Sequence, residues 1–158
     1  MEKQYINLYK QYHETIKKHS SAVMNAGRDA SFELFEQLGF PTTKLEKYKY
    51  TDLSDALSYD YGLNINRLNI PVNPYQVFKC DVPGIHSYLY FVLNDGFYPI
   101  TDKRNEDLPE NVIICSLREA SEKYPALVEK YYGKLTAGQK DGLVAFNGAF
   151  AQDGFFMY

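Results

Sequence analysis

The stretch Gly39-Phe-Pro-Thr-Thr-Lys-Leu-Glu-Lys-Tyr-Lys-Tyr-Thr-Asp-Leu53 contains the signals of a helix end, a turn and a restart. It follows an apolar run at helical spacing. Gly39 can adopt the left-handed conformation that closes a helix, and Pro41 cannot donate the hydrogen bond that would continue it. The stretch therefore predicts a fixed helix end with a structured turn behind it.

The second half of this stretch predicts a new helical turn with a basic and aromatic surface. Thr43 and Glu46 have the spacing of a capping box, so we expect the turn to begin at Lys44. Three lysines alternate with two tyrosines here, in the order Lys44, Lys47, Tyr48, Lys49 and Tyr50. One interpretation is a nucleic-acid surface. The other is that the tyrosines pack and the lysines stay in solvent.

The totals limit the class of protein. A chain of 158 residues has room for one ordinary domain, or for one domain plus part of another. Its 15 tyrosines and 10 phenylalanines supply much of the apolar surface, and a net charge of -3 argues against a phosphate-binding domain. No signal peptide or membrane-length apolar run is present, and Cys80 and Cys115 form no Cys-x-x-Cys pair. We expect a soluble cytoplasmic protein that is not exported, with two ordinary buried thiols.

Helical periodicity covers the first part of the chain. An amphipathic helix is predicted from Glu2 to Met24; because its apolar face is mostly tyrosine, we expect it on the outside of the domain. A second helix is predicted after Gly27 and ends at Gly39.

The middle of the chain has the pattern of a connector followed by strands. Residues Ser54 to Asn73 carry scattered apolar anchors, which predicts an irregular connector held against the domain. Strands are predicted at Val77 to Val82 and at Ser87 to Leu93, the latter covered on both faces. An Asn-Asp-Gly turn ending at Gly96 then predicts a hairpin that returns from Phe97 to Ile100.

The last third predicts short helices between two strands. A charged loop from Thr101 to Glu110 leads to a strand at Val112 to Cys115. The remaining signals are a capping box from Ser116 to Glu119, a helix from Pro125 to about Tyr132 stopped by Gly133, a helix capped by Asp141, and a strand from Phe155 to Tyr158. A chain that ends on four apolar strand residues leaves an unpaired edge. We therefore expect an excised piece of a longer protein that can self-associate.

No group of residues predicts catalysis or metal binding. His13 and His19 are six residues apart on a helix and point in different directions, and His86 is distant in sequence. The cysteines have no evident neighbouring base, and carboxylate pairs such as Glu33 with Glu36 are predicted to face solvent. There is no glycine-rich phosphate loop. We expect no catalytic, cofactor-binding or metal residue in this chain, which is not predicted to be an enzyme.

Two separated segments resemble the N-terminal region of SufD, in the SufB/SufD family of iron-sulfur cluster assembly proteins. The first is Gly39 to Leu53, preceded by Arg28, Ala30, Phe32 and Phe35, with Tyr48 where the family usually has Trp. The second is Asp141 to Tyr158, which is similar to the segment leading into the family's β-helix. Tyr90 to Gly96, Leu108 to Val112 and Ser116-Leu117 follow in the same order, so the resemblance covers the chain from about Gly27 onward.

This resemblance implies an α+β fold. Helices would pack on a small mixed or antiparallel sheet in residues 1–140, and residues 141–158 would form the lead-in helix and first strand of a truncated right-handed parallel β-helix. It implies a non-catalytic scaffold with SufB-like and SufC-like partners. The iron-sulfur cluster belongs to the whole complex, with no cofactor, membrane or nucleic acid bound by this fragment. The family's cluster-assembly residues and SufC contact would lie beyond Tyr158.

Four alternatives remain on the sequence: the related SufB N-terminal region, an unrelated protein-interaction module, a nucleic-acid-binding module, and a small-molecule enzyme with a concave pocket. For the scaffold interpretation we expect Lys44, Lys47 and Tyr48, together with the first helix, to form a partner-docking surface, because amphipathic aromatic residues are dense there. The structural interpretation is that this segment only locks the second helix in place.

Overall fold

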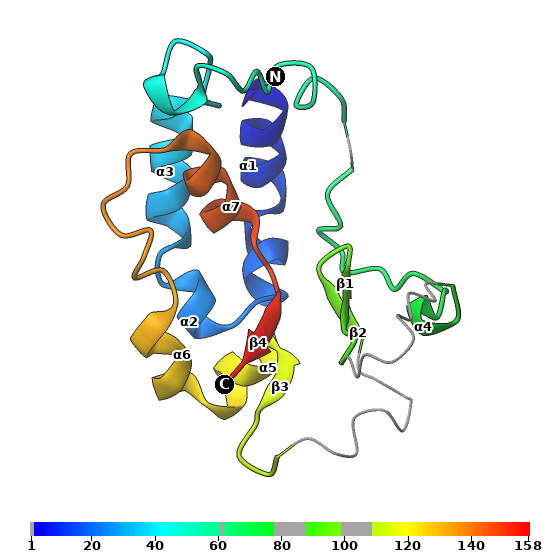
Figure 1. The fold of residues 1–158 in the computed structure, drawn as a ribbon. Helices are drawn as coiled ribbons and strands as arrows, with labels where there is room; N and C mark the ends of the chain where they lie inside the picture. Colours follow the sequence, from blue (N-terminus) through cyan, green and yellow to red (C-terminus); the bar gives the residue numbers. More distant parts are fainter. Residues whose placement is uncertain (1, 61, 78–87, 99–108) are drawn as a thin grey trace.

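The computed structural model describes residues 2–60, 62–77, 88–98 and 109–158, and helices dominate it (Figure 1). The helical elements in chain order are α1 (Glu2–Lys18), α2 (Ala22–Asn25), α3 (Arg28–Leu38), the 3-10 turn η1 (Glu46–Tyr48), α4 (Pro74–Val77), α5 (Leu117–Lys123), α6 (Pro125–Tyr131) and α7 (Gly142–Phe150). The strands are β1 (Phe91–Leu93), β2 (Gly96–Tyr98), β3 (Ile114–Ser116) and β4 (Phe155–Met157).

The main core lies between α1, α3 and α7, which run side by side in Figure 1. It is largely aromatic: the Tyr9 ring stacks on Phe32 at 4.0 Å between centroids, and the Tyr5 ring meets Phe146 edge-on at 5.0 Å. Such pairs add specific geometry to the burial of apolar area. The N-terminal helices α1 and α3 therefore pack with α7 around one helical core and not, as was expected, on a sheet. The small antiparallel sheet of the prediction is present as two two-stranded sheets, and α5 and α6 pack against the pair β3–β4.

The first helix differs from its prediction in position and length. Tyr5, Tyr9 and Ile16 are buried, so α1 is a core helix and not an outer one. Tyrosine suits this place because each ring is buried while its hydroxyl donates outward; Tyr9 Oη bonds Asp29 Oδ1 at 3.0 Å. The helix ends at Lys18, and Ser21 starts α2 by accepting a hydrogen bond from the Met24 amide, which explains why one helix to Met24 does not form.

The end of α3 is as predicted, but the restart is not. Gly39 has φ +63° and its amide donates to the Phe35 carbonyl. The following turn, η1, begins at Glu46 and not at Lys44, and no side chain caps it. Because Thr43 lies three residues before η1, the Thr43–Glu46 pair does not act as a capping box.

The third core helix, α7, begins at the predicted cap. The Asp141 carboxylate accepts hydrogen bonds from the amides of Leu143 and Val144 at 3.0 and 3.3 Å. Helix α7 packs against α3, so residues on the two sides of the expected domain boundary at 140/141 are in contact. The domain boundary itself stays a prediction.

The β1–β2 hairpin confirms the Asn-Asp-Gly turn. Its two antiparallel strands pair Phe91 with Tyr98, and Asn94 and Asp95 both have positive φ, as a tight two-residue turn requires. The strand starts at Phe91, however, and Val92 is 42% exposed, so the expectation of a strand covered on both faces is wrong. Val77 ends α4 instead of starting a strand; residues 78–87 and 99–108 of the predicted strands and charged loop lie outside the described residues.

The second sheet joins two strands that are far apart in the sequence. β3 and β4 pair antiparallel, with Cys115 opposite Phe156, and both side chains face a second apolar cluster on α5 and α6. The capping hydroxyl of Ser116, the start of α6 at Pro125 and the positive φ of Gly133 behind it agree with the sequence. The terminal strand, which was expected to be unpaired, therefore pairs with β3 along one edge, and no β-helix is present in the described residues.

The connector from Ser54 to Asn73 is irregular and partly held down, as predicted. Ile65 is buried in the main core and Leu57 and Leu63 pack against it, whereas Leu68 is exposed. In the ranges that the structure describes, no helix has both the length and the apolar character needed to cross a membrane.

Candidate docking surface

The lysine and tyrosine segment forms a protruding turn behind α3. Lys44, Lys47 and Lys49 are exposed, as is Leu45, and Tyr50 is 92% exposed. Among the described residues, neither Lys44 nor Lys47 has an ion-pair partner, so both ammonium groups are available to another molecule. The prediction that these lysines stay in solvent is therefore confirmed. The prediction that the tyrosines pack is wrong for Tyr50, which does not pack against the fold.

Tyr48 fixes this turn to the core. Its hydroxyl lies 2.9 Å from Asp141 Oδ2 and 3.2 Å from Oδ1, so the carboxylate that caps α7 also accepts a hydrogen bond from η1. Burial, and then this hydrogen bond, raise the pKa of Tyr48. Of the three expected docking residues, Lys44 and Lys47 point outward, while Tyr48 has an internal partner and orients the other two.

Two glycines bring the base of the turn against α7. A Cβ at Gly142 would overlap the Gly39 carbonyl, so the first residue of α7 can only be glycine in this packing. A Cβ at Gly39 would come within 3.2 Å of the Glu2 side chain, and its positive φ also favours glycine. The turn thus sits on a junction of α1, α3 and α7.

Arg28 holds the opposite end of α7. Its side chain is fully buried, and its Nη1 and Nη2 atoms donate to the carbonyls of Ala149 and Ala151 at 2.6 and 2.7 Å. Nε and Nη2 also donate to Asn25 Oδ1 and Ser20 Oγ. No carboxylate is among these partners; the negative end of the α7 dipole faces the guanidinium instead. Burial lowers the pKa of Arg28.

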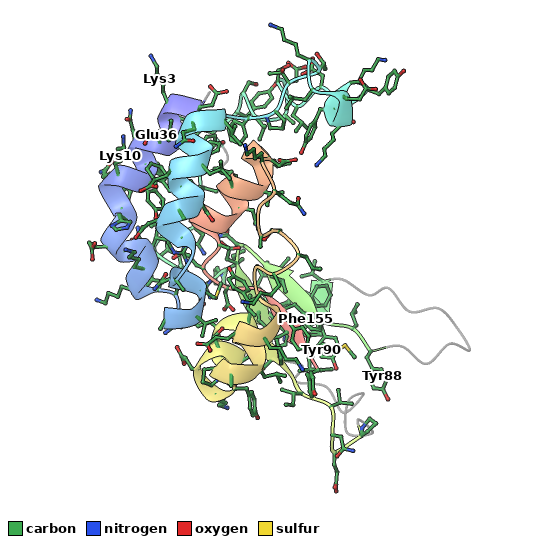
Figure 2. All side chains as sticks on the ribbon, turned by 90° about the vertical axis from the view of Figure 1, so that its left-hand side faces the viewer. Lys3, Lys10, Glu36, Tyr88, Tyr90 and Phe155 are labelled. Carbon is green, nitrogen blue, oxygen red and sulfur yellow. The ribbon has the colours of Figure 1, made fainter. Side chains whose placement is uncertain are left out.

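A polar cluster ties α1 to the start of α3. Asp29 accepts from Lys17 Nζ at 2.8 Å and from Tyr9 Oη at 3.0 Å, and its Oδ1 lies 2.8 Å from His13 Nε2. The hydrogen bonds from Lys17 and His13 hold the pKa of Asp29 well below its usual range, whereas burial raises the pKa of Tyr9. On the outside of the same helices, Lys10 and Glu36 form an exposed ion pair at 2.6 Å (Figure 2).

An ion pair connects the connector to the hairpin and the second sheet. Arg67 Nη2 lies 2.8 Å from Asp153 Oδ2, and Arg67 Nη1 donates to the Asp95 carbonyl. The Asp153 side chain is only 4% exposed and also accepts from the Arg118 amide. The sequence predicted neither this ion pair nor the burial of the Arg28 side chain. An arginine in a polar connector and an arginine at a helix start look like solvated residues until their distant partners are known.

The described residues contain no group of three or more His, Cys, Asp or Glu side chains arranged to hold a metal ion. His13 bonds Asp29, while His19 Nδ1 lies 2.9 Å from the Ile65 carbonyl, so the two imidazoles serve different contacts. Cys115 is a buried free thiol whose pKa is raised by burial, which opposes formation of a nucleophilic thiolate. Cys80 and His86 lie outside the described residues.

Comparison with known proteins places the chain in a family. The model of the SufBD protein N-terminal region matches residues 1–158, so the chain belongs to this family. The iron-sulfur cluster assembly SufBD family protein ABCI9 of Arabidopsis thaliana is 34% identical to it over 94 residues. Those residues are 59% of this chain and 18% of the plant protein. No solved structure matches the chain.

Proposed function

We propose that this chain is the N-terminal region of a SufD-like scaffold subunit that acts in iron-sulfur cluster assembly. The observation that carries the proposal is the family match along the whole chain, supported by the plant relative, whose name states cluster assembly. In this role the domain positions SufB-like and SufC-like subunits in the cytoplasm and performs no chemistry itself. Of the two matching segments, Gly39 to Leu53 separates SufD from SufB better than Asp141 to Tyr158 does. This segment therefore favours SufD over SufB.

The docking surface of the scaffold is the turn around η1. Lys44 and Lys47 present two ammonium groups that have no ion-pair partner within the described ranges, and exposed Leu45 lies between them in sequence. The Tyr48–Asp141 hydrogen bonds and the glycine contact with α7 hold this turn in place before a partner arrives. A pre-positioned surface of this kind loses less conformational entropy on binding. Its charge predicts an acidic patch on the partner subunit.

Charge reversal tests the proposal. In the full-length subunit, K44E/K47E should weaken assembly with purified SufB-like and SufC-like subunits at least tenfold, and cluster maturation should fall with it. K3E/K18E makes the same change in net charge at two exposed positions of α1, the helix that the sequence also placed in the docking surface. It should assemble normally because the proposed surface is limited to the turn around η1; weaker assembly would show that α1 also contacts the partner. Analytical gel filtration measures assembly, and visible absorbance measures the cluster.

The same experiment separates docking from stability. Tyr48→Phe removes the Asp141 hydrogen bonds and should lower the free energy of unfolding by about 1 kcal/mol, with the lysines still present. K44E/K47E should leave unfolding within about 0.5 kcal/mol, because both lysines are exposed. Normal assembly and normal cluster content in K44E/K47E would show that this turn is not the docking surface.

A further inference from the structure

Among the residues that the structure describes, Tyr50 is the most exposed of the large apolar residues, at 92%. Its neighbour Tyr48 donates its hydroxyl hydrogen to Asp141, but the Tyr50 ring contacts Lys49, whose Nζ lies 5.5 Å from the ring centroid. The fold therefore gains little from the Tyr50 ring. The ring face away from Lys49 and the ring edge are free to meet another molecule.

The backbone around Tyr50 is held in place before any partner binds. The Tyr48 amide donates to the Leu45 carbonyl at 2.9 Å, and the Thr51 amide donates to the Tyr48 carbonyl at the same distance. The second of these turns contains Tyr50 itself. Because the Tyr48 hydroxyl also fixes this backbone to Asp141, binding at Tyr50 would restrict mainly the rotation of its side chain.

Positive charge surrounds Tyr50. Residues 44–50 contain three lysines and one glutamate, so this short segment carries +2 in a chain whose net charge is -3. Lys44, Lys47 and Lys49 have no ion-pair partner in the described part of the chain. A complementary surface must therefore supply carboxylates to the lysines and apolar walls to the ring.

We propose that Tyr50 anchors this docking surface, and that its ring enters an apolar pocket on the partner subunit whose rim carries carboxylates. The proposal rests on the function proposed above, because it requires the turn around η1 to meet a partner subunit. Tyrosine is enriched among residues that carry most of the binding energy of an interface, and such residues fill central pockets enclosed by weaker contacts. Lys44, Lys47 and Lys49 form the enclosing contacts, which speed association, whereas the buried ring slows dissociation.

The observations favour a pocket on a protein over a strand of nucleic acid. Strand binding without sequence preference uses several aromatic residues, on which successive bases stack. In the described part of this turn only Tyr50 is free to stack, because the hydroxyl of Tyr48 is bonded to Asp141. The negative net charge of the chain also opposes phosphates that extend beyond the three lysines.

Binding kinetics separate the anchor from the lysines. The full-length subunit and its variants are passed over immobilised SufB-like and SufC-like subunits in surface plasmon resonance. Tyr50→Ala should speed dissociation from the subunit that carries the pocket by about tenfold or more, and change the association rate by less than about threefold. K44E/K47E should mainly slow association. Tyr50→Phe keeps the ring and should dissociate like the unchanged protein.

Tyr131→Ala is the matched control. Tyr131 is 56% exposed and also follows a lysine, and Lys130 Nζ lies 5.2 Å from its ring centroid. It belongs to α6, which lies at the opposite end of the molecule from the turn around η1 (Figure 1). Tyr131→Ala should leave both rates unchanged. Equal acceleration of dissociation by Tyr50→Ala and Tyr131→Ala would show general aromatic adhesion and would overturn the proposal.

The remaining outcomes distinguish this proposal from the function on which it rests. Unchanged dissociation of Tyr50→Ala with slower association of K44E/K47E would remove the anchor but keep the docking surface. Unchanged rates in every variant, or no binding of the unchanged protein to either subunit, would overturn both. Saturable binding of fluorescein-labelled oligothymidylate that Tyr50→Ala abolishes would also overturn the pocket, because the ligand of the ring would then be a nucleic acid.

Discussion

Among the residues that the structure describes, Arg28 is the most deeply buried charged residue. Its guanidinium makes four hydrogen bonds from full burial, two of them to carbonyls at the end of α7. Arginine suits this place because its planar fork can reach acceptors in several directions at once, which a lysine ammonium cannot do. The residue therefore connects the beginning of α3 to the end of α7 across most of the chain.

Arg28→Lys should lower the free energy of unfolding by about 2–4 kcal/mol, because at least two buried acceptors lose a charged donor. Urea denaturation followed by circular dichroism measures the change. Arg118→Lys is the control: its guanidinium forms an exposed i,i+4 pair with Glu122, worth less than about 0.5 kcal/mol. Equal stability of the two variants would contradict the role assigned to Arg28.

Residues that act locally could be predicted from the sequence, and residues that act at a distance could not. Asp141 and Ser116 cap helices that begin immediately after them, and their own spacing reveals this role. Two of the four partners of Arg28, the carbonyls of Ala149 and Ala151, are more than 120 positions away in sequence. Tyr48 was expected in a docking surface, but its bond to Asp141 depends on α7 folding back against the Gly39 turn.

At the level of elements, α3 and α7 pack closely because small residues line their contact. Gly142 meets the Gly39 backbone, and a Cβ at Gly148 would lie 2.6 Å from Ser31 Oγ. Glycine lowers helix propensity, so its presence at both positions of α7 is explained by the approach of α3 and not by the helix itself.

Gly142→Ala should destabilise the protein by about 1–3 kcal/mol despite the better helix propensity of alanine, because the added methyl overlaps backbone atoms that cannot rotate away. The melting temperature in differential scanning calorimetry measures the change. Gly27→Ala is the control, since no atom lies within 4 Å of its added Cβ. In Gly27→Ala, alanine reduces the conformational freedom of the unfolded chain, which raises stability, but it is a slightly poorer N-cap than glycine, which lowers stability. The two effects should offset each other, so the melting temperature should change little. A stable Gly142→Ala variant would mean that α7 does not pack as described.

Elements were predictable where their signal is local. The hairpin turn, the end of α3 and the starts of α5, α6 and α7 follow from glycine, proline and capping residues at fixed offsets. The burial of α1 was not predictable from its tyrosine-rich face, because tyrosine packs equally well in a core or at its boundary. The capping box at Thr43 failed because a matching pair of residues does not guarantee that the backbone turns there.

At the scale of the whole molecule, two apolar clusters share one chain. The helices α1, α3 and α7 surround the larger cluster, and β3, β4, α5 and α6 form the smaller one. The Arg67–Asp153 pair joins the connector to the segment between α7 and β4. The two ends of the described chain therefore belong to different clusters, with β4 completing the smaller one (Figure 1).

A chain ending at Gly154 should lose protection in the smaller cluster first. Without β4, Phe156 and the pairing with β3 are absent, which should cost about 3 kcal/mol or more. Hydrogen exchange should rise in α5 and α6 while α1 and α3 remain protected. The 158-residue chain is the reference, because Tyr158 also contributes to the pairing with β3 through two backbone hydrogen bonds to Ile113. Unchanged exchange in α5 and α6 would contradict this role for β4.

The sequence by itself determined the hairpin turn, the end of α3, the starts of α5, α6 and α7 and the resemblance to the SufBD family, because turn glycines, capping residues and family motifs act over a few neighbouring positions. Only the tertiary structure decided where those pieces go. It buried α1, paired β4 with β3 instead of leaving it alone, and turned Tyr48 inward while leaving Lys44 and Lys47 exposed. These outcomes depend on contacts between distant segments, which are fixed only when the whole chain packs.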